Sequence, residues 1–455
     1  MLKKSKKLVF IISLFLLLSL SLTAAVQAEA KNVILLVGDG MGIGQIDMAR
    51  YFEGGKDHEL ELMKMPETGI MMTSSTEGVT DSAAAGTAMA TGHKVYNGAI
   101  AMNKNGSELD SVLDFAESRD KATGIISTNM VTDATPAAFT ASVKDRGMGG
   151  EIAKQILNND VEVVLGGGRE DFKEENAGEN LIAKAKEMGY QYVSDKTQME
   201  KALPMKGKLL GLFNESYMNY ILDRDNLDSN EPNLYQMTKK AVEILSEDED
   251  GFFLMAEGAR IDHAAHAADV PGVVAETLDF DRAVEYAMNF AKENEDTLVI
   301  VTADHETLGF SVTEPINKEA LKNIEVSPEY MASKMTEKEN GKGYTVESVK
   351  SVFKEYADIS LTDKEVARFN RLILDEEGNI KYSYLVGYEI GSIIANKYQA
   401  GLLNTEIRAN SSTGGHTLNS VPIFAYGEGA EKFNGMMQNV EFSDLLFDSM
   451  KPGTN

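Results

Sequence analysis

Residues 33–42 read Val-Ile-Leu-Leu-Val-Gly-Asp-Gly-Met-Gly, a short apolar run that ends in a glycine-rich turn. Similar apolar runs recur along the chain at 124–127, 161–165, 252–255, 298–301 and 421–424. Helical patterns separate them, and between Val273 and Met288 bulky apolar residues recur at three- and four-residue spacing. Strands alternating with helices predict an α/β fold, with a mostly parallel central sheet flanked by helices on both faces.

Polar side chains follow four of these runs, where each strand is expected to end. They are Asp39 after the first run, Asp133 and Thr135 after the second, Glu257 after 252–255, and Asp304-His305 after 298–301. The carboxyl ends of parallel strands meet at one edge of a sheet, where ligands gather. We therefore expect these side chains to converge on one site, and their chemistry favours a metal site.

The segment Glu257-Gly-Ala-Arg-Ile-Asp-His-Ala-Ala-His266 is the strongest local motif. Asp262 and His266 are four residues apart, so they share one face of a helix at a spacing that suits one Zn²⁺. His416 supplies a further imidazole from a glycine-rich loop. The chain has no cysteine, so imidazoles and carboxylates must hold any metal.

The segment Val79-Thr-Asp-Ser-Ala-Ala-Ala-Gly-Thr87 predicts a helix that begins near Ser82, with Thr80 or Asp81 as its N-cap. Free N–H groups and the helix dipole in that first turn would stabilise a phosphoryl group on Ser82. On local sequence alone, a simple capping role for Ser82 is the plainer interpretation. No histidine lies near it in the sequence to act as its base, so we expect a metal ion to activate it.

Composition and charge limit the function classes. The 455 residues are 43% hydrophobic and 25% charged, which excludes wholesale disorder. The formal charge of −27 argues against a nucleic-acid-binding module, although a local metal or arginine can still attract a small anion. The turn at 38–42 lacks the third glycine of a dinucleotide-binding fingerprint, and its carboxylate would repel a pyrophosphate.

Residues 1–28 are predicted to be a signal peptide, with cleavage as late as residue 30 as a variant. Four lysines precede an apolar run from Leu8 to Leu22, and an uncleaved membrane anchor is the alternative. Cleavage after Ala28 would take the formal charge from −27 to −31 and leave no membrane span in the mature chain. We expect an exported protein in the periplasm, outside the cell or at the cell surface.

Residues 29–455 are predicted to form one catalytic domain with an insertion at about 311–410. This insertion is rich in Lys and Glu and separates His305 from His416. A second excursion is predicted from Arg169 to about Pro232.

Six motifs, in this order, resemble the signatures of alkaline phosphatases. They are Gly-Asp-Gly-Met-Gly from Gly38, Thr-Asp-Ser-Ala-Ala-Ala-Gly-Thr-Ala from Thr80, Asp-Ala-Thr-Pro-Ala-Ala from Asp133, Glu-Gly-Ala-x-Ile-Asp-x-x-x-His from Glu257, Thr-Ala-Asp-His from Thr302 and Thr-Gly-Gly-His-Thr from Thr413. The resemblance spans residues 38–417. It implies a secreted bacterial phosphomonoesterase with the fold of that family, an accessory subdomain and a homodimeric state.

The resemblance also implies a role for each matched residue, with two Zn²⁺ and one Mg²⁺ per subunit. One zinc ligand set would be Asp262, His266 and His416, the other Asp39, Asp304 and His305, and Asp39 would bridge to a Mg²⁺ completed by Thr135 and Glu257. Ser82 would attack phosphorus to form phosphoserine, and Arg146 would grip two phosphoryl oxygens. Small phosphate monoesters would be hydrolysed to an alcohol and inorganic phosphate.

The metal at the third site is the least settled part of this interpretation. Asp133 and His263 occupy the two positions that vary in the family. An imidazole can ligate, so Zn²⁺ or Co²⁺ should compete with Mg²⁺ better here than beside a lysine. In the alternative, His263 only hydrogen-bonds a metal-bound water.

Two other functions compete with this one. A phosphodiesterase or sulfatase would belong to the same metalloenzyme group, but the sulfatase setting Cys-x-Pro-x-Arg is missing around Ser82. A non-catalytic, acidic cell-surface protein that binds metal cations would explain the charge, but not the coexistence of Ser82, Arg146 and three ligand sets.

Overall fold

The computed structural model describes residues 30–203, 207–402 and 405–451, so the predicted signal peptide lies outside the described residues. Within these ranges the chain forms a ten-stranded sheet in the order β12-β2-β11-β8-β1-β7-β3-β4-β6-β5. The strands are β1 (Asn32–Val37), β2 (Glu67–Met72), β3 (Ala122–Met130), β4 (Val163–Gly167), β5 (Gln191–Val193), β6 (Leu209–Leu212), β7 (Phe252–Glu257), β8 (Thr297–Thr302), β11 (Val421–Gly427) and β12 (Gly435–Gln438).

The centre of the sheet is parallel. β1 pairs in parallel with β7 and β8, and the register sets Val37 opposite both Glu257 and Thr302. β11 is antiparallel to β8 and to β2. Every residue of β1, β7 and β8 is buried, as expected for strands covered on both faces. The predicted α/β class with a mostly parallel sheet is confirmed.

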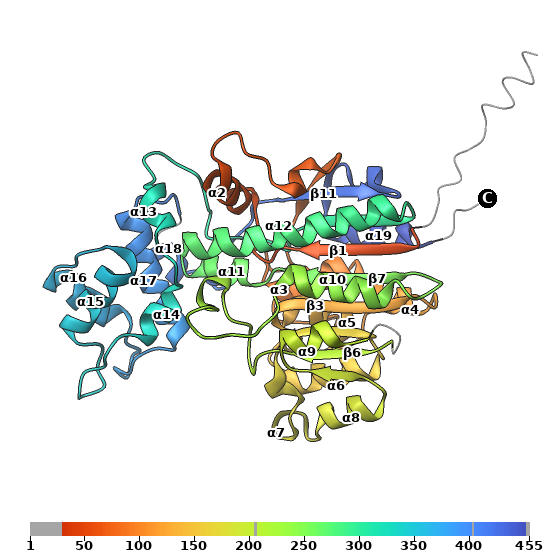
Figure 1. The fold of residues 1–455 in the computed structure, drawn as a ribbon, viewed down its shortest axis with the longest axis horizontal. Helices are drawn as coiled ribbons and strands as arrows, with labels where there is room; N and C mark the ends of the chain where they lie inside the picture. The colour runs from red at the N-terminus through yellow and green to blue at the C-terminus, as the bar shows by residue number, and fades with distance from the viewer. Residues whose placement is uncertain (1–29, 204–206, 403–404, 452–455) are drawn as a thin grey trace, which may run out of the picture.

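Helices cover both faces of this sheet (Figure 1). The long helix α12 and α10 lie in front of it in that view, and α4, α5 and α19 lie behind it. The α-helices before residue 308 and after residue 417 are α2 (Ile43–Gly54), α3 (Ser82–Thr91), α4 (Val112–Glu117), α5 (Ala134–Thr140), α6 (Gly149–Asn158), α7 (Glu174–Ala177), α8 (Leu181–Glu187), α9 (Lys196–Lys201), α10 (Leu234–Leu245), α11 (Arg260–His266), α12 (Val270–Glu293) and α19 (Asn439–Ser449).

Helix α3 begins at Ser82, as the sequence predicts. The side chain of Asp81 caps it by accepting a hydrogen bond from Ala84 N at 3.0 Å. All ten residues of α3 are buried and most are small, which lets the helix approach α5 closely. A Cβ added to Gly86 would lie 3.1 Å from the Cβ of Ala138. Backbone packing therefore fixes the position of Ser82.

The segment between β9 (Glu306–Thr307) and β10 (His416–Thr417) forms a separate lobe, called the accessory lobe below, at the left of Figure 1. Its described residues supply six helices and no strand of the ten-stranded sheet. These are α13 (Lys318–Lys322), α14 (Pro328–Ser333), α15 (Val346–Ala357), α16 (Asp363–Leu372), α17 (Ser383–Lys397) and α18 (Thr405–Ala409). The lobe packs around an apolar core with side chains such as Phe353, Phe369 and Val386, and helices α2, α11 and α12 contribute residues to the same core.

The predicted excursion from Arg169 to about Pro232 is wrong, because this segment extends the sheet. β6 pairs in parallel with β4, and β5 pairs in parallel with β6 at the sheet's edge. β5 has three residues and β6 has four, which is too short to give a clear pattern in the sequence.

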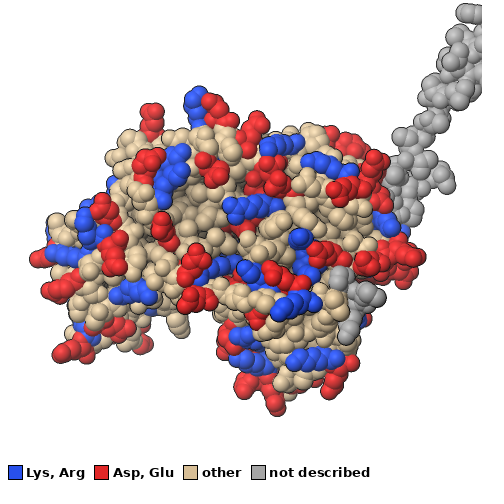
Figure 2. All heavy atoms as spheres, viewed as in Figure 1, with Lys and Arg blue, Asp and Glu red and all other residues tan. Residues whose placement is uncertain are grey.

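Two further observations concern the surface. On the face shown in Figure 2, acidic and basic side chains are interspersed over the accessory lobe and over the part of the molecule that contains the sheet. Among the described residues, no helix combines the length and the apolar character needed to cross a bilayer.

Candidate active site

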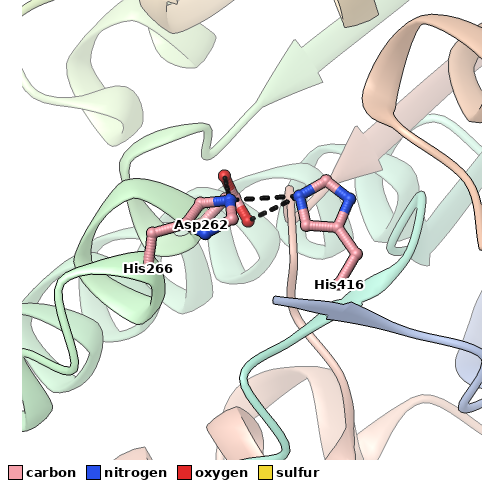
Figure 3. Close-up of side chains that lie close together, drawn as sticks. All are labelled: Asp262, His266 and His416. Carbon is pink, nitrogen blue, oxygen red and sulfur yellow. Dashed lines mark hydrogen bonds and ion pairs between the residues drawn. The ribbon is translucent and has the colours of Figure 1, made fainter. Parts of the chain in front are cut away.

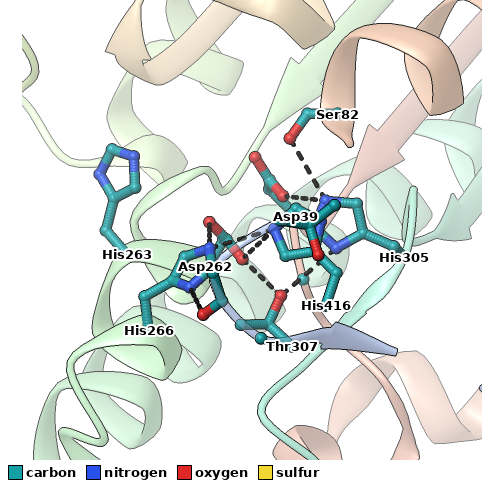
Figure 4. A network of polar contacts seen from close by, with 12 residues as sticks. Asp39, Ser82, Asp262, His263, His266, His305, Thr307 and His416 are labelled. Carbon is teal, nitrogen blue, oxygen red and sulfur yellow. Dashed lines mark hydrogen bonds and ion pairs between the residues drawn. The ribbon is translucent and has the colours of Figure 1, made fainter. Parts of the chain in front are cut away.

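Two groups of buried acidic and imidazole side chains lie beyond the carboxyl ends of β1, β7 and β8 (Figures 3 and 4). In each group, one ligand atom per residue lies within 4.8 Å of the others. The first group is Asp262, His266 and His416, and the second is Asp39, Asp304 and His305. These are the two zinc ligand sets that the sequence predicts, and the fold brings each set together.

The first group joins helix α11 to the first residue of β10. The Nε2 atom of His266 lies 3.2 Å from Asp262 Oδ2 and 3.0 Å from His416 Nε2. The Nδ1 atom of His266 donates to the carbonyl oxygen of Gly414 at 2.9 Å, and Nδ1 of His416 donates to that of Thr80 at 2.9 Å. These bonds turn Nε2 of both rings toward the site, so Nε2 is the atom that would ligate a metal when each ring is neutral.

Glycines permit the close approach of these ligands. Gly40 has a φ of 68°, and a Cβ there would lie 2.6 Å from Asp262 Oδ1. Gly414 has a φ of 74°, and a Cβ there would lie 3.1 Å from His266 Cε1. Both positions need the left-handed backbone that glycine adopts freely, and neither has room for a side chain.

The second group follows β1 and β8 directly. His305 Nε2 lies 3.4 Å from Asp39 Oδ1 and 3.2 Å from Asp304 Oδ2. The short β9–β10 pair sets His416 opposite Thr307, so the rings of His305 and His416 stack with centroids 3.6 Å apart. The two groups are therefore in direct contact through the stacked imidazoles of His305 and His416.

The electrostatics of the second group favour a bound cation. Burial, with repulsion from Asp304, raises the pKa of Asp39 well above its ordinary value, and burial raises the pKa of Asp304 to about 6. Asp39 Oδ1 and Asp304 Oδ2 are buried and accept no hydrogen bond from any described residue. Buried carboxylates without partners are costly, and a metal cation would neutralise them.

In the first group, attraction to the imidazoles outweighs burial. Burial alone would raise the pKa of Asp262, but the charge and hydrogen bond of His266 hold it well below its ordinary value. Burial lowers the pKa of His416 to about 3, and that of His305 in the second group to about 4. Both imidazoles are therefore neutral, the form that ligates metals.

A third set of oxygen atoms lies beyond β3 and β7. Glu257 Oε2 accepts a hydrogen bond from Ser127 Oγ at 2.5 Å, and burial raises the pKa of Glu257 to about 8. Glu257 Oε1 and Thr135 Oγ1 are buried and make no hydrogen bond within the described part of the chain. Their donor chemistry, oxygen only, suits Mg²⁺.

Ser82 and Arg146 face the ligand groups. Ser82 Oγ lies 3.2 Å from His305 Nε2, an approach that local sequence did not reveal because the residues are 223 positions apart. Arg146 lies between two carboxylates, with Nη1 3.2 Å from Asp81 Oδ2 and Nη2 3.4 Å from Asp133. Burial lowers the pKa of Arg146, but the negative charges of Asp133 and Asp81 raise it by more. The net pKa therefore lies above the ordinary value for arginine, and the guanidinium remains charged.

His263 points away from both ligand groups in Figure 4. Its Nδ1 atom lies 2.5 Å from Arg260 Nη1, and its ring makes an edge contact with Tyr217 at 5.3 Å. Burial, together with Arg260, lowers its pKa to about 3, so the ring is neutral. The role of His263 in choosing the third metal stays a prediction.

Sequence reasoning missed three side chains that contact the site. Thr307 Oγ1 donates to Asp262 Oδ1 at 2.5 Å, and the position of Thr307 two residues after His305 was a usable signal. Arg408 donates to the carbonyl oxygen of His266 at 3.0 Å, and the ring of Tyr388 stacks on that of His266 at 5.9 Å. Both come from the accessory lobe, and no local pattern marks them.

Comparison with known proteins decides the family. The family model for alkaline phosphatase matches residues 30–451. The chain belongs to the alkaline phosphatase family. Alkaline phosphatases are phosphomonoester hydrolases, so the chain is an enzyme of this class. The resemblance seen in the six motifs is confirmed.

Relatives and solved structures agree with this membership. Alkaline phosphatase 4 of Bacillus subtilis (strain 168) is 35% identical over 444 residues, which cover 94% of this chain and 90% of the relative. The alkaline phosphatase of Escherichia coli (strain K12) is 38% identical over 329 residues, covering 61% and 70%. The Thermus thermophilus alkaline phosphatase superposes with a TM-score of 0.81 at 26% identity, covering 94% of this chain and 93% of that one. A cold-active alkaline phosphatase from Shewanella sp. gives 0.76 at 29% identity, covering 92% and 100%.

Proposed function

We propose that this alkaline phosphatase hydrolyses phosphate monoesters through a phosphoserine on Ser82, at a site that holds two Zn²⁺ and one Mg²⁺. The observation that carries the proposal is the meeting of Ser82 Oγ with the second ligand group, 3.2 Å from His305 Nε2. A serine at the first position of a helix, beside two buried ligand sets and a charged arginine, has the parts that phosphoryl transfer needs.

The residues fit the metals. Two buried carboxylate oxygens of the second group, Asp39 Oδ1 and Asp304 Oδ2, have no hydrogen-bond donor among the described residues. Asp262, His266 and His416 would hold one Zn²⁺, and Asp39, Asp304 and His305 the other. Asp39, Thr135 and Glu257 would hold Mg²⁺ through oxygen atoms. When bound, the ions supply positive charge that stabilises the entering and leaving oxygens at phosphorus.

Related structures support the Mg²⁺ assignment. A variant of the alkaline phosphatase from the Antarctic bacterium TAB5 has Mg bound in its M3 site. That structure superposes on this chain with a TM-score of 0.66 at 27% identity. Zn²⁺ or Co²⁺ at the third site remains the alternative that His263 suggests.

The chain's own groups bind and orient the phosphoryl group. Arg146 presents a planar, charged fork that can donate two hydrogen bonds to two phosphoryl oxygens. The N–H groups in the first turn of α3 add the positive end of the helix dipole. Asp81 and Asp133 orient Arg146, so the substrate need not order it.

The reaction has two steps. In the first, Ser82 Oγ loses its proton and bonds to phosphorus, and the ester P–O bond breaks with its electron pair on the departing alcohol oxygen, which takes up a proton. In the second, water attacks phosphoserine from the opposite side, which frees Ser82 and inorganic phosphate. Two in-line displacements retain the configuration at phosphorus.

Three features of the whole protein belong to this proposal. Residues 1–28 are removed on export, and the segment at about 311–410 is an accessory subdomain of the catalytic domain. The enzyme is a homodimer, which is supported by exposed apolar side chains beside the β2–β12 edge of the sheet, among them Ile43, Ile70 and Met436. Mass spectrometry of the mature chain and sedimentation analysis test these features.

The decisive experiment replaces the nucleophile. Ser82→Ala should lose most monoester turnover and the ability to trap labelled phosphate at mildly acid pH, while retaining its metal content. Ser443→Ala, which removes a buried hydroxyl that makes no hydrogen bond in the described chain, is the matched control. Wild-type rates in Ser82→Ala, or a preference for a diester above tenfold, would overturn the proposal.

A further inference from the structure

Three consecutive polar residues, Ser127, Thr128 and Asn129, lie near the end of strand β3, and the chemistry described above does not use Asn129. All three side chains are buried, and Asn129 is 1% exposed. The regular pairing of β3 with β7 ends at Ser127, and the pairing of β3 with β4 is irregular between Ile126 and Met130. Asn129 therefore lies on an irregular strand end and not in a continuous ladder.

Two glycines of β4 allow the backbone of this strand end to pack closely. A Cβ at Gly166 would lie 2.7 Å from the carbonyl oxygen of Ser127, and a Cβ at Gly167 would lie 3.1 Å from that of Asn129. In addition, the backbone N–H of Asn129 donates to Ser127 Oγ at 2.8 Å. The backbone of Asn129 is thus held by β4 and by Ser127, which gives its side chain a fixed starting point.

The side-chain amide of Asn129 makes two hydrogen bonds. Its Oδ1 atom accepts from Met130 N at 2.8 Å, and its Nδ2 atom donates to Asp133 Oδ2 at 2.9 Å. The reverse orientation of the amide would place a donor against the N–H of Met130 and an acceptor against the carboxylate of Asp133. The amide therefore has one favourable orientation, in which its N–H group faces Asp133.

The carboxylate of Asp133 is free to accept this bond because it does not cap its helix. Asp133 is the N-cap residue of α5, but its side chain makes no capping hydrogen bond. A capping side chain usually accepts from the N–H of the second or third helical residue, and the third residue here is Pro136, which has no N–H group. The carboxylate faces Arg146 instead, with Nη2 3.4 Å from both of its oxygens.

Asp133 is one of the two carboxylates that hold Arg146. Burial lowers the pKa of Arg146, and among the charges that raise it that of Asp133 is the largest, ahead of that of Asp81. The side chains of Arg146 and Asp133 are 34% and 16% exposed, so packing alone does not fix them. The hydrogen bond from Asn129 therefore helps to set where the carboxylate of Asp133, and with it the guanidinium, lies.

We propose that Asn129 is a positioning residue of the phosphoryl site, which acts on bound phosphate through Asp133 and Arg146. This proposal rests on the proposed function, because that function assigns Arg146 to the phosphoryl group. The amide of Asn129 holds the Asp133 carboxylate, and the carboxylate orients the guanidinium before phosphate arrives. A guanidinium that is already ordered loses less conformational freedom on binding, so phosphate binds more tightly.

The test is a calorimetric titration of inorganic phosphate into the enzyme loaded with zinc and magnesium, with the metal content measured for each variant. Asn129→Ala should raise the dissociation constant about two- to tenfold, because Arg146 must then be ordered on binding. Asn129→Leu keeps the branching and approximate size of the side chain but has no N–H group, and it should show the same change. Melting curves show that each variant is folded.

Asn370→Ala is the matched control. Asn370 is 6% exposed and also makes two side-chain hydrogen bonds, at 2.7 Å from Tyr344 N and 2.8 Å to Tyr344 O in the accessory lobe. Its loss should lower the melting temperature and leave the dissociation constant for phosphate unchanged. A purely structural role of Asn129 would give this same result in the two Asn129 variants.

A double variant tests the path through Arg146. In Arg146→Ala, adding Asn129→Ala should change the dissociation constant by less than about twofold. An unchanged constant in the folded Asn129 variants, or a loss in the Arg146→Ala background as large as in the parent, would overturn the inference while leaving the hydrolase intact. A parent enzyme that hydrolyses no phosphate monoester with zinc and magnesium present would instead refute the proposed function.

Discussion

The substitution Asp81→Ala should change two measurable properties, the free energy of unfolding and the affinity for phosphate, because Asp81 both caps helix α3 and pairs with Arg146. Asp81 Oδ1 caps α3 at Ala84 N, and its Oδ2 accepts from Gly98 N at 3.0 Å and from Arg146 Nη1 at 3.2 Å. Loss of the cap costs about 1 kcal/mol, and the orphaned Gly98 N–H about 1 kcal/mol more. We expect a loss of about 2 kcal/mol in the free energy of unfolding.

The same change removes one of the two carboxylates that orient Arg146, and among the described residues Asp133 at 3.4 Å is the carboxylate that remains. Ordering a long side chain on binding costs about 0.5–1.5 kcal/mol, which corresponds to a roughly two- to tenfold weaker affinity for phosphate. Removing a negative charge near the anion acts in the opposite direction, but partly exposed charge pairs contribute about 1 kcal/mol or less. Asp81→Asn isolates this charge effect, because the amide oxygen can still cap α3.

The assay is competitive inhibition by inorganic phosphate, with melting curves in parallel. Asp195→Ala is the matched control, since Asp195 caps α9 through Gln198 N at 2.9 Å and has no arginine partner among the described residues. It should lower stability and leave the inhibition constant unchanged. In Arg146→Ala, adding Asp81→Ala should weaken phosphate binding little further. Additive losses of phosphate affinity in the double variant, or an unchanged inhibition constant in Asp81→Ala, would refute the proposal that Asp81 orients Arg146.

Three further predictions follow from burial and packing. Chelation should abolish turnover and lower the melting temperature, both restored by zinc and magnesium, because bound ions stabilise only the folded ligand sets; an unchanged melting temperature would speak against filled sites. Burial raises the pKa of Asp269 to about 8, so the stability that its protonated form contributes is present below about pH 4 and lost as the pH rises through 8. Asp269→Asn should therefore raise the melting temperature at pH 9 and progressively less toward pH 5, whereas a constant difference would show that Asp269 does not titrate there. Gly391→Ala should destabilise the accessory lobe, because its Cβ would lie 1.9 Å from the carbonyl oxygen of Ala267; a parent-like melting curve would contradict this packing.

The sequence was most informative where the sheet is most buried. The runs that became β1, β7 and β8 are apolar throughout because both faces of a central parallel strand are covered. Strand β2, by contrast, alternates between buried and exposed residues and contains a glycine, and β5 and β6 are very short. These strands lie at an edge of the sheet or next to one, and they owe their conformation to pairing with neighbouring strands, which no local pattern records.

The clustering of the candidate ligand residues was predictable for a related reason. A carboxylate directly after a buried strand must lie at the sheet's edge, and an Asp and a His four apart on a helix must share a face. Contacts between distant segments were not predictable in this way. The approach of His305 to Ser82 and the ion pair of Arg146 with Asp81 depend on how whole elements pack. The same holds for the meeting of Tyr217, Tyr220, Tyr384 and Tyr388 around one cavity.

The two ligand groups differ in what holds them. Asp39, Asp304 and His305 follow strands of the central sheet, whereas His266 is also held by Arg408 and Tyr388 of the accessory lobe. Local opening of a protein begins in its less stable units, and the accessory lobe, whose described residues supply no strand to the ten-stranded sheet, can open in this way. A partial opening of the lobe would loosen the first ligand group while the second stayed intact. Such an opening would therefore weaken a cation held by the first ligand group more than one held by the second.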